Sequence, residues 1–172
     1  MATSRPSPGD TIRAAWRRLA PLPGGRALFS RMLGFIAPYS GSIRPRVVAL
    51  EPGYARVRMA DRRAVRNHLD SVHAVALANL AELASGLAML ASLPPTARGI
   101  PIRIAVEYFK KARGTLEAEC RCALPDVSAD CEHEFLSSIH DAAGDEVARA
   151  TVRWKLGPLA PAIGNRQSGM EA

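Results

Sequence analysis

The apolar positions of the chain recur at helical spacing in two places, and each place predicts a helix. Over about 26–36 this spacing gathers five side chains on one face: Leu28, Phe29, Met32, Leu33 and Ile36. Over about 73–92 Ala, Leu and Met fill nearly every position, and Pro94-Pro95 ends the run because the residue before a proline avoids helical backbone. Since this second helix is apolar on almost every side, we expect it to be buried on most of them.

Alternating apolar and polar positions predict six strands, two before the long helix and four after it. The first two cover about 43–50 and 54–60, and Glu51-Pro52-Gly53 between them predicts a hairpin. The other four cover about 101–109, 115–123, 132–140 and 146–156. Gly114 favours a hairpin between the first two of these, and the turn at 141–145 favours another between the last two.

The order of these elements indicates one α+β domain. Six antiparallel strands can form a sheet that wraps around the apolar helix, and this arrangement buries the apolar faces of both. Within the 172 residues, we expect this domain to occupy 26–157. Residues 1–25 are expected to be a mobile segment, with a short helix that could begin at Asp10 as its N-cap, and 158–172 a disordered tail.

Charge and composition narrow the choice of partners without fixing it. The formal net charge is +7, from 23 Lys and Arg against 16 Asp and Glu, so a phosphorylated ligand, nucleic acid or a membrane surface would be attracted. Aromatic residues make up only 5%, which gives little support to stacking on single-stranded nucleic acid. The apolar run at 74–91 is interrupted by polar residues, which is unfavourable for a membrane span. We therefore expect neither nucleic acid nor a membrane as a partner.

Cysteine usage and the N-terminus indicate the compartment. The three cysteines are Cys120, Cys122 and Cys131, and no CxxC pair occurs, which speaks against a disulfide framework and against a zinc site. No apolar signal region follows the basic residues of the first twenty positions. A cytoplasmic location is the expectation from both observations.

Glu82 is the first candidate for chemistry. It lies in the middle of the long apolar helix, where carboxylates are almost never fully buried without a partner. Burial in an apolar site would raise its pKa. Asn79 and Gly86 share its stripe of the helix and give that stripe a polar character. Two structural alternatives stand beside a catalytic role: a solvated seam at the edge of the sheet, or a buried carboxylate held by structural partners.

The approach to the long helix, at 67–74, is the second candidate, and it reads Asn-His-Leu-Asp-Ser-Val-His-Ala. The start of a helix carries free N–H groups and the positive end of the helix dipole, so it can stabilise an oxyanion. Asn67 and His73 could be aimed at the same point. For His73 the alternative is a helix N-cap or a core histidine, and for Asn67 it is ordinary turn chemistry.

This segment, with Glu82 eight residues after Ala74, resembles the signature of the hot-dog-fold acyl-CoA thioesterases, especially the phenylacetate-pathway type and an uncharacterised branch. Their pattern is Asn, a Gly three residues later, His-Gly after that, and an acidic residue on the long helix. Asn67, His73 and Glu82 match it, whereas Asp70 and Ala74 stand in place of the glycines. The resemblance implies a hot-dog fold, a homodimer or homotetramer, and an active site between subunits.

The resemblance also implies an activity, the hydrolysis of acyl-CoA thioesters. Glu82 would act as general base on water or attack the carbonyl directly. The Ala74 N–H would stabilise the oxyanion, Asn67 would orient the thioester or the water, and His73 would position the loop or the thioester. No cofactor and no metal are expected, because the coenzyme A thioester is itself the substrate.

The basic segment Lys110-Lys111-Ala112-Arg113-Gly114 connects two predicted strands. In the resembled family Lys110, Lys111 and Arg113 would hold the coenzyme A phosphates. The alternative is a solvated, charged turn. The departures at Asp70 and Ala74 favour a different function class, a non-catalytic hot-dog module that binds acyl-CoA or a partner protein. A nucleic-acid-binding domain is the third possibility, and strongly salt-dependent binding would support it.

Overall fold

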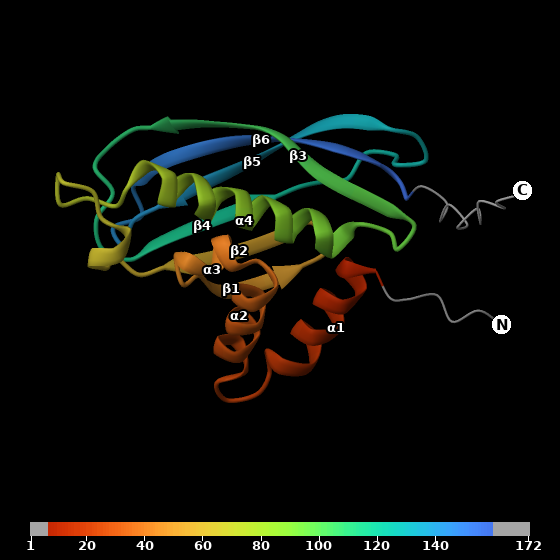
Figure 1. Cartoon of the computed structure of the whole chain (residues 1–172), viewed down its shortest axis with the longest axis horizontal. Coiled ribbons are helices and arrows are strands. Elements are labelled where there is room, and N and C mark those ends of the chain that lie inside the picture. The colour runs from red at the N-terminus through yellow and green to blue at the C-terminus, as the bar shows by residue number, and fades with distance from the viewer. Residues whose placement is uncertain (1–6, 160–172) are drawn as a thin grey trace, which may run out of the picture.

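The computed structural model describes residues 7–159, and these form a six-stranded antiparallel sheet around one long helix, α4 (Ala74–Ser92) (Figure 1). The strands are β1 (Arg46–Glu51), β2 (Tyr54–Met59), β3 (Ala97–Tyr108), β4 (Leu116–Arg121), β5 (Cys131–His140) and β6 (Glu146–Pro158). Their order in the sheet is β1-β2-β4-β5-β6-β3. The hot-dog fold expected from the sequence is confirmed.

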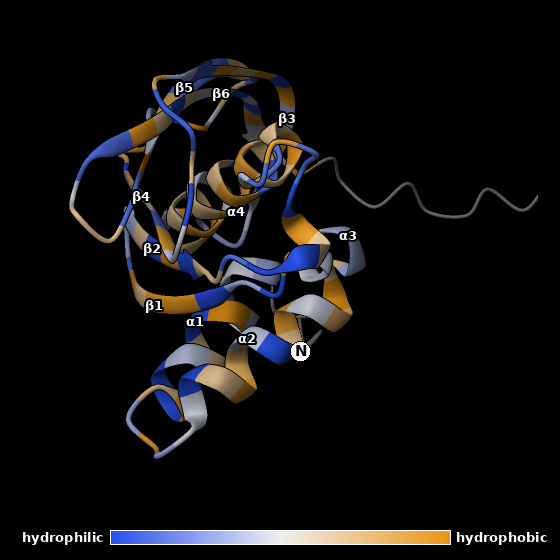
Figure 2. Cartoon of the chain, turned by 90° about the vertical axis from the view of Figure 1, so that its left-hand side faces the viewer, coloured by the Kyte–Doolittle hydropathy of each residue, from blue (hydrophilic) through white to orange (hydrophobic). Residues whose placement is uncertain are grey.

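The core lies between α4 and the concave face of the sheet. Figure 2 shows the strands in an arc around α4. The alternation predicted for the strands is confirmed on β2, β4 and β6, where every second side chain is buried. Leu80 and Met89 of α4 are fully buried, and each such side chain contributes about 1.5–3 kcal/mol to stability.

The apolar character of α4 is explained by this packing. By length and composition alone, the helix could span a membrane, but 67% of its most apolar window is buried inside the domain. Leu93 has extended backbone at the C-cap, directly before Pro94-Pro95, and therefore ends the helix where the sequence predicted.

Three shorter helices precede the sheet and gather on one side of α4: α1 (Pro8–Leu19), α2 (Gly25–Ile36) and α3 (Pro38–Ser42) (Figure 1). The prediction that Asp10 is the N-cap of α1 is wrong. Ser7 is the cap, and Asp10, at position N3 of the helix, completes a capping box with it. Arg13 donates hydrogen bonds to the carbonyls of Ala91 and Leu93 at 3.1 and 3.2 Å, which ties α1 to the end of α4.

The predicted hairpin between β3 and β4 is wrong. β3 pairs with β6, whereas β4 pairs with β2 and β5, so the intervening link carries the chain from one edge of the sheet to its middle. Gly114 does adopt a φ of +70° there, which shows that the local turn signal was read correctly. A turn signal does not specify which strand will be the partner. The hairpins β1–β2 and β5–β6 are confirmed.

Candidate active site

The loop before α4 is held by backbone hydrogen bonds at both of its ends. Asn67 N donates to Ser71 O at 2.8 Å, and His73 N donates to Val65 O at 2.8 Å. Val72 pairs with Arg66 in an isolated bridge, and its N–H donates to Ala112 O at 2.8 Å. The loop is therefore a closed, rigid turn, and it positions the first residues of α4.

Asn67 organises this loop through its side-chain oxygen. Oδ1 accepts from Leu69 N at 2.9 Å, from Ser71 N at 3.3 Å and from Ser71 Oγ at 3.2 Å. This is the turn chemistry considered for Asn67. Within residues 7–159 its amide nitrogen, Nδ2, donates no hydrogen bond, so this NH₂ group remains available to a ligand.

His73 is the N-cap of α4, and its Nδ1 accepts from Val75 N at 3.1 Å. The neutral ring then carries its proton on Nε2. The N–H of Ala74 has no acceptor in the described part of the chain, and Ala74 is exposed, so this donor of the helix N-terminus is open to a ligand. Tyr108 donates to Ala74 O at 3.1 Å and thus connects the end of β3 to the same turn.

Asp70 occupies a position with a φ of +52°, in the left-handed region. A glycine at this point, as in the resembled thioesterases, would adopt this backbone without steric cost. Aspartate tolerates it better than most residues. The departure from the family pattern therefore keeps the loop conformation, although it adds an exposed carboxylate three residues before the N-cap, His73.

The basic segment Lys110–Gly114 connects β3 to β4, and we call it the basic link. It lies against this loop. Arg113 Nε donates to Asp70 O at 3.2 Å, and Gly114 N donates to Asp61 at 3.0 Å. Lys110 is engaged with two carboxylates, Asp141 at 2.7 Å and Asp145 at 2.6 Å, and they raise its pKa. These contacts leave Lys111 as the one member of the basic segment with no such contact in the described chain.

Glu82 lies on the side of α4 that faces α1, α2 and α3. It lines a pocket of about 190 Å³, to which α1, α2 and α4 contribute apolar side chains and α3 contributes Ser40 and Gly41. Burial raises the pKa of its carboxyl group, and no hydrogen bond or ion pair within residues 7–159 counteracts that shift. The neighbouring polar groups of the stripe are satisfied, since Asn79 donates to Tyr39 O at 3.2 Å and Ser85 to the backbone carbonyl of Glu82 at 2.9 Å.

Trp154 of β6 closes the pocket beside Glu82. A Cβ added to Gly86 would lie 3.3 Å from the Trp154 ring and 3.8 Å from Glu82 Oε1, so the glycine lets the indole pack against α4 next to the carboxylate. The indole Nε1 is buried and has no hydrogen-bond partner in the described part of the chain. The apolar alternation of the strand predicted over 146–156 does not single out Trp154, because it cannot show that a buried indole N–H lacks an acceptor.

Along α4, the two halves of the candidate site are well separated. At about 1.5 Å per residue, the eight residues from Ala74 to Glu82 correspond to roughly 12 Å along the helix axis. A carbonyl group bound to the Ala74 N–H cannot also contact the Glu82 carboxylate of the same chain. The structure thus brings Asn67, His73, Ala74 and the basic link together and places Glu82 apart from them.

Comparison with known proteins places the chain in a family. A family model described as a domain of unknown function, DUF4442, matches residues 25–156. The chain belongs to DUF4442. This family is of the hot-dog, thioesterase-like kind, which confirms the resemblance found in the sequence. No curated protein sequence matches the chain.

Solved structures share the DUF4442 fold. A protein called genomics APC5556 is 35% identical, with a TM-score of 0.76, over 87% of this chain and 99% of its own. A probable thioesterase from Pseudomonas aeruginosa is 24% identical, with a TM-score of 0.68, over 80% and 97% of the two chains. A thioesterase from Staphylococcus aureus is 15% identical, with a TM-score of 0.63, over 70% and 99%.

Among residues 7–159, no three His, Cys, Asp or Glu side chains lie close enough to hold a metal ion. The arrangement offers two things to a ligand: open N–H donors at the start of α4, and a desolvated carboxylate in an apolar pocket. Both suit the attack of water on a carbonyl group.

Proposed function

We propose that this protein hydrolyses acyl-CoA thioesters, with Glu82 as the general base. The observation that carries the proposal is the Glu82 carboxylate, which is half-buried among apolar side chains with no partner of its own in the described chain. A surface residue would be solvated, and a structural one would be hydrogen-bonded. Burial moves its pKa upward, toward the operating pH at which a general base is most effective.

The proposed reaction begins with a water molecule beside Glu82. The carboxylate takes one proton from the water as its oxygen adds to the thioester carbonyl. The oxyanion that forms would accept hydrogen bonds from the N–H of Ala74 and from Nδ2 of Asn67. As the tetrahedral intermediate collapses, the carbon–sulfur bond breaks, and the thiolate recovers a proton from the protonated Glu82. His73 holds the first turn of α4 in place through its cap.

The site requires two copies of the chain in this proposal. One chain holds Ala74 and Glu82 roughly 12 Å apart along the helix axis, so Glu82 of one subunit would face the Asn67–Ala74 loop of another. β3 is an edge strand of the sheet, and its face carries the exposed side chains of Ile100, Ile102, Ile104 and Tyr108. An exposed apolar edge is typical of a strand that pairs with a further chain. A homodimer through β3, or a tetramer built from it, would cover this edge.

The pocket beside Glu82 supports an apolar acyl group. Its volume of about 190 Å³ exceeds the roughly 150 Å³ of an apolar cavity that holds benzene. Apart from Glu82, no residue of its lining is titratable. A thioester with a charged acyl group would leave that charge unpaired, and we therefore expect uncharged acyl groups of modest size as substrates.

A second function is favoured by the hydrogen bonds of the loop. Oδ1 of Asn67 and Nδ1 of His73 are both engaged with the backbone, and so they would act on a ligand only through the shape of the loop. A module that binds acyl-CoA without hydrolysing it would need only a loop of fixed shape, with no side chain that reacts with the ligand.

One experiment separates the two functions. A panel of acyl-CoAs of different acyl lengths is incubated with the protein, and the free thiol is measured alongside equilibrium binding of the same ligands. Hydrolysis predicts thiol release that saturates with substrate. Binding of several acyl-CoAs at micromolar affinity without any thiol release would support the module and reject the hydrolase.

A further inference from the structure

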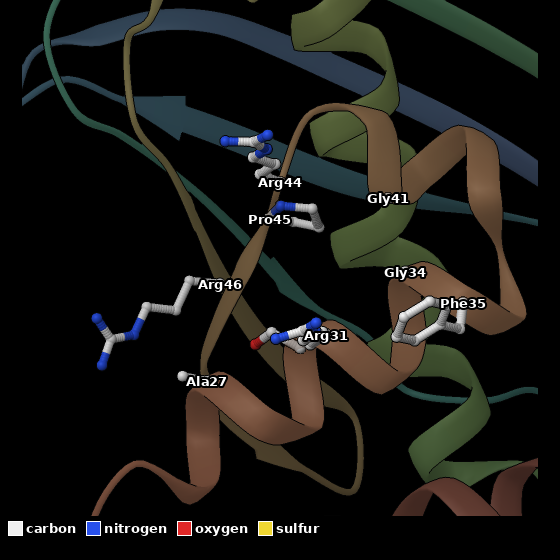
Figure 3. A pocket seen from close by; sticks show the side chains of 9 residues that line it. Ala27, Arg31, Gly34, Phe35, Gly41, Arg44, Pro45 and Arg46 are labelled. Atoms are coloured by element: carbon white, nitrogen blue, oxygen red, sulfur yellow. The ribbon is translucent and has the colours of Figure 1, made fainter.

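A second hollow, next to the pocket of Glu82, carries a cluster of positive charge. It has a volume of about 590 Å³ and lies between α2, α3 and the start of β1. Arg31, Arg44 and Arg46 contribute to its lining, together with Phe35, which is 74% exposed. In Figure 3 Arg44 and Arg46 lie on one side and Phe35 on the other, with Arg31 between them and Gly34 next to Phe35.

The three arginines are free to bind an anion. All are exposed, and within residues 7–159 none of them lies within 4 Å of a carboxylate oxygen or takes part in a side-chain hydrogen bond. Lys110 in the basic link is different, because Asp141 and Asp145 already hold it. Most other arginines of the sheet are likewise paired, as Arg58 is with Glu117 and Arg153 with Glu134.

The backbone at Arg44 is unusual and supports a role for its side chain. Its φ is +51°, in the left-handed region, and Pro45 follows it. This conformation costs a residue with a side chain roughly 1–2 kcal/mol relative to glycine. Arg44 N donates to Gly41 O at 2.9 Å, so the turn at the end of α3 imposes the conformation. A glycine would satisfy this turn, yet the chain has an arginine there.

The arginine hollow adjoins the pocket of Glu82. Gly34, Gly41 and Pro45 line both. The two glycines also let α2 and α3 approach closely, since a Cβ on Gly41 would lie 2.7 Å from Gly34 Cα. One elongated ligand could therefore lie across this shared wall, with one end among the arginines and the other at Glu82.

We infer that the hollow lined by Arg31, Arg44 and Arg46 binds the phosphate groups of a coenzyme A thioester. The inference rests on the proposed function, and it adds the site for the polar end of that substrate. Coenzyme A has phosphates at one end and an uncharged arm leading to the thioester at the other, which is the order of the two adjoining hollows. Arginine forks bind phosphate oxygens in pairs. Phe35 offers an aromatic face on which the adenine ring can stack.

The test compares coenzyme A affinity in three variants of the full chain, each of which removes three positive charges. The first, Arg31→Gln/Arg44→Gly/Arg46→Gln, removes all three arginines from the lining of the hollow. Glycine is chosen at position 44 because it suits the left-handed backbone there. The second, Arg17→Gln/Arg18→Gln/Arg63→Gln, is the control, because all three of its arginines are exposed outside both hollows. The third changes Lys110, Lys111 and Arg113 to Gln and tests the basic link. Calorimetry at low salt with coenzyme A, dephospho-coenzyme A and pantetheine gives the readout.

The hollow variant should bind coenzyme A about 10- to 100-fold more weakly, the loss expected when charged hydrogen bonds are removed. Its affinity for pantetheine and the affinities of the control should not change. The inference is overturned if the hollow variant binds coenzyme A like wild type, if the basic link accounts for the larger loss, or if wild type binds pantetheine as tightly as coenzyme A. Wild type that binds coenzyme A through these arginines without hydrolysing its thioesters would reject the proposed hydrolysis and support the phosphate site.

Discussion

The loop before α4 and the middle of α4 treat their polar groups in opposite ways. In the loop, Asn67 Oδ1 alone accepts three hydrogen bonds, and Nδ1 of His73 caps the helix. Two turns further on, the Glu82 carboxylate has no partner in the described chain and is desolvated by apolar neighbours. The first region is a rigid frame that leaves only selected N–H donors open. The second holds a reactive group in a costly environment.

This contrast indicates that Glu82 is the group to test for a chemical role and that the loop is the region to test for a positioning role. A buried carboxylate without a partner is destabilising, so a role beyond folding is needed to explain it. A loop in which most polar groups are bonded is explained by folding alone, and its catalytic value lies in where it holds Ala74 N–H. The two regions can form one site only if they come from different subunits.

The largest effect is expected at Glu82. Glu82→Gln keeps the size of the side chain but removes its basicity, so turnover of an acyl-CoA should fall by roughly 10²–10⁴-fold. The melting temperature should stay the same or rise at neutral pH, because a charge is no longer desolvated. Thiol release and thermal unfolding of the same preparation measure both. A folded variant with wild-type turnover would end the catalytic assignment.

The pH dependence of stability provides the control for this variant. Burial raises the pKa of Glu82 above its ordinary value of 4.5 in the folded state. The stabilisation from its protonated form is therefore complete below that ordinary value and is lost as the pH rises through the higher, folded-state pKa. The stability advantage of Glu82→Gln should thus be small below pH 4.5 and grow as the pH rises above it. An advantage that does not change with pH would show that the carboxylate is not desolvated.

Asn67→Asp should have the next largest effect. The change keeps the oxygen that Leu69 and Ser71 bind but replaces the Nδ2 donor, so the loop should fold while turnover falls by roughly 10²–10³-fold. Mixed dimers then locate the site. In a mixed dimer of one Asn67→Asp subunit and one Glu82→Gln subunit, one of the two shared sites contains both native residues and the other contains neither. Equal co-expression should therefore restore about a quarter of wild-type activity. No recovery in purified mixed dimers would mean that each site lies within one chain.

A charge on the β3 edge should have a smaller effect, through assembly. Ile104 is 45% exposed, and Ile104→Asp should dissociate a dimer that pairs through β3 and lower turnover about tenfold at nanomolar concentration. Leu136→Asp is the matched control, since Leu136 is 51% exposed on β5, a strand with neighbours on both sides. Light scattering should show the 18.4 kDa monomer for the first variant only. If wild type is already a monomer at micromolar concentration, the shared site is rejected.

Sequence periodicity predicted the elements of this fold well, but not all of their pairing. The long helix and all six strands were found because a buried helix and half-buried strands leave different apolar periods. The partner of β3 was missed because hairpin and crossover links can contain the same turn residues, and Gly114 fits either. The short helix α3 was not predicted, since its sequence, Pro-Tyr-Ser-Gly-Ser, has no helical apolar period.

For the candidate site, the sequence revealed a charged residue in an apolar segment but missed charged residues in polar segments. Glu82 was visible as a carboxylate in an apolar helix. Arg31, Arg44 and Arg46 were not, because they come from separate elements and arginine is common along the whole chain. What identifies them is the absence of nearby carboxylates and the left-handed backbone of Arg44, and both are three-dimensional facts.

The smallest effect is expected at Asp70, where the chain departs from the glycine of the resembled pattern. Its φ of +52° suits glycine, so Asp70→Gly relieves backbone strain, while the greater entropy of glycine in the unfolded chain offsets part of the gain. The free energy of unfolding should rise by at most about 1 kcal/mol. Turnover should stay the same or increase slightly, because a negative charge near the oxyanion donor is removed. Asp70→Ala removes the same charge but keeps the strained backbone, so it should be less stable than Asp70→Gly while hydrolysing at a similar rate. If Asp70→Gly instead reduces turnover tenfold with the fold intact, the Asp70 carboxylate takes part in the reaction, and the loop is more than a frame.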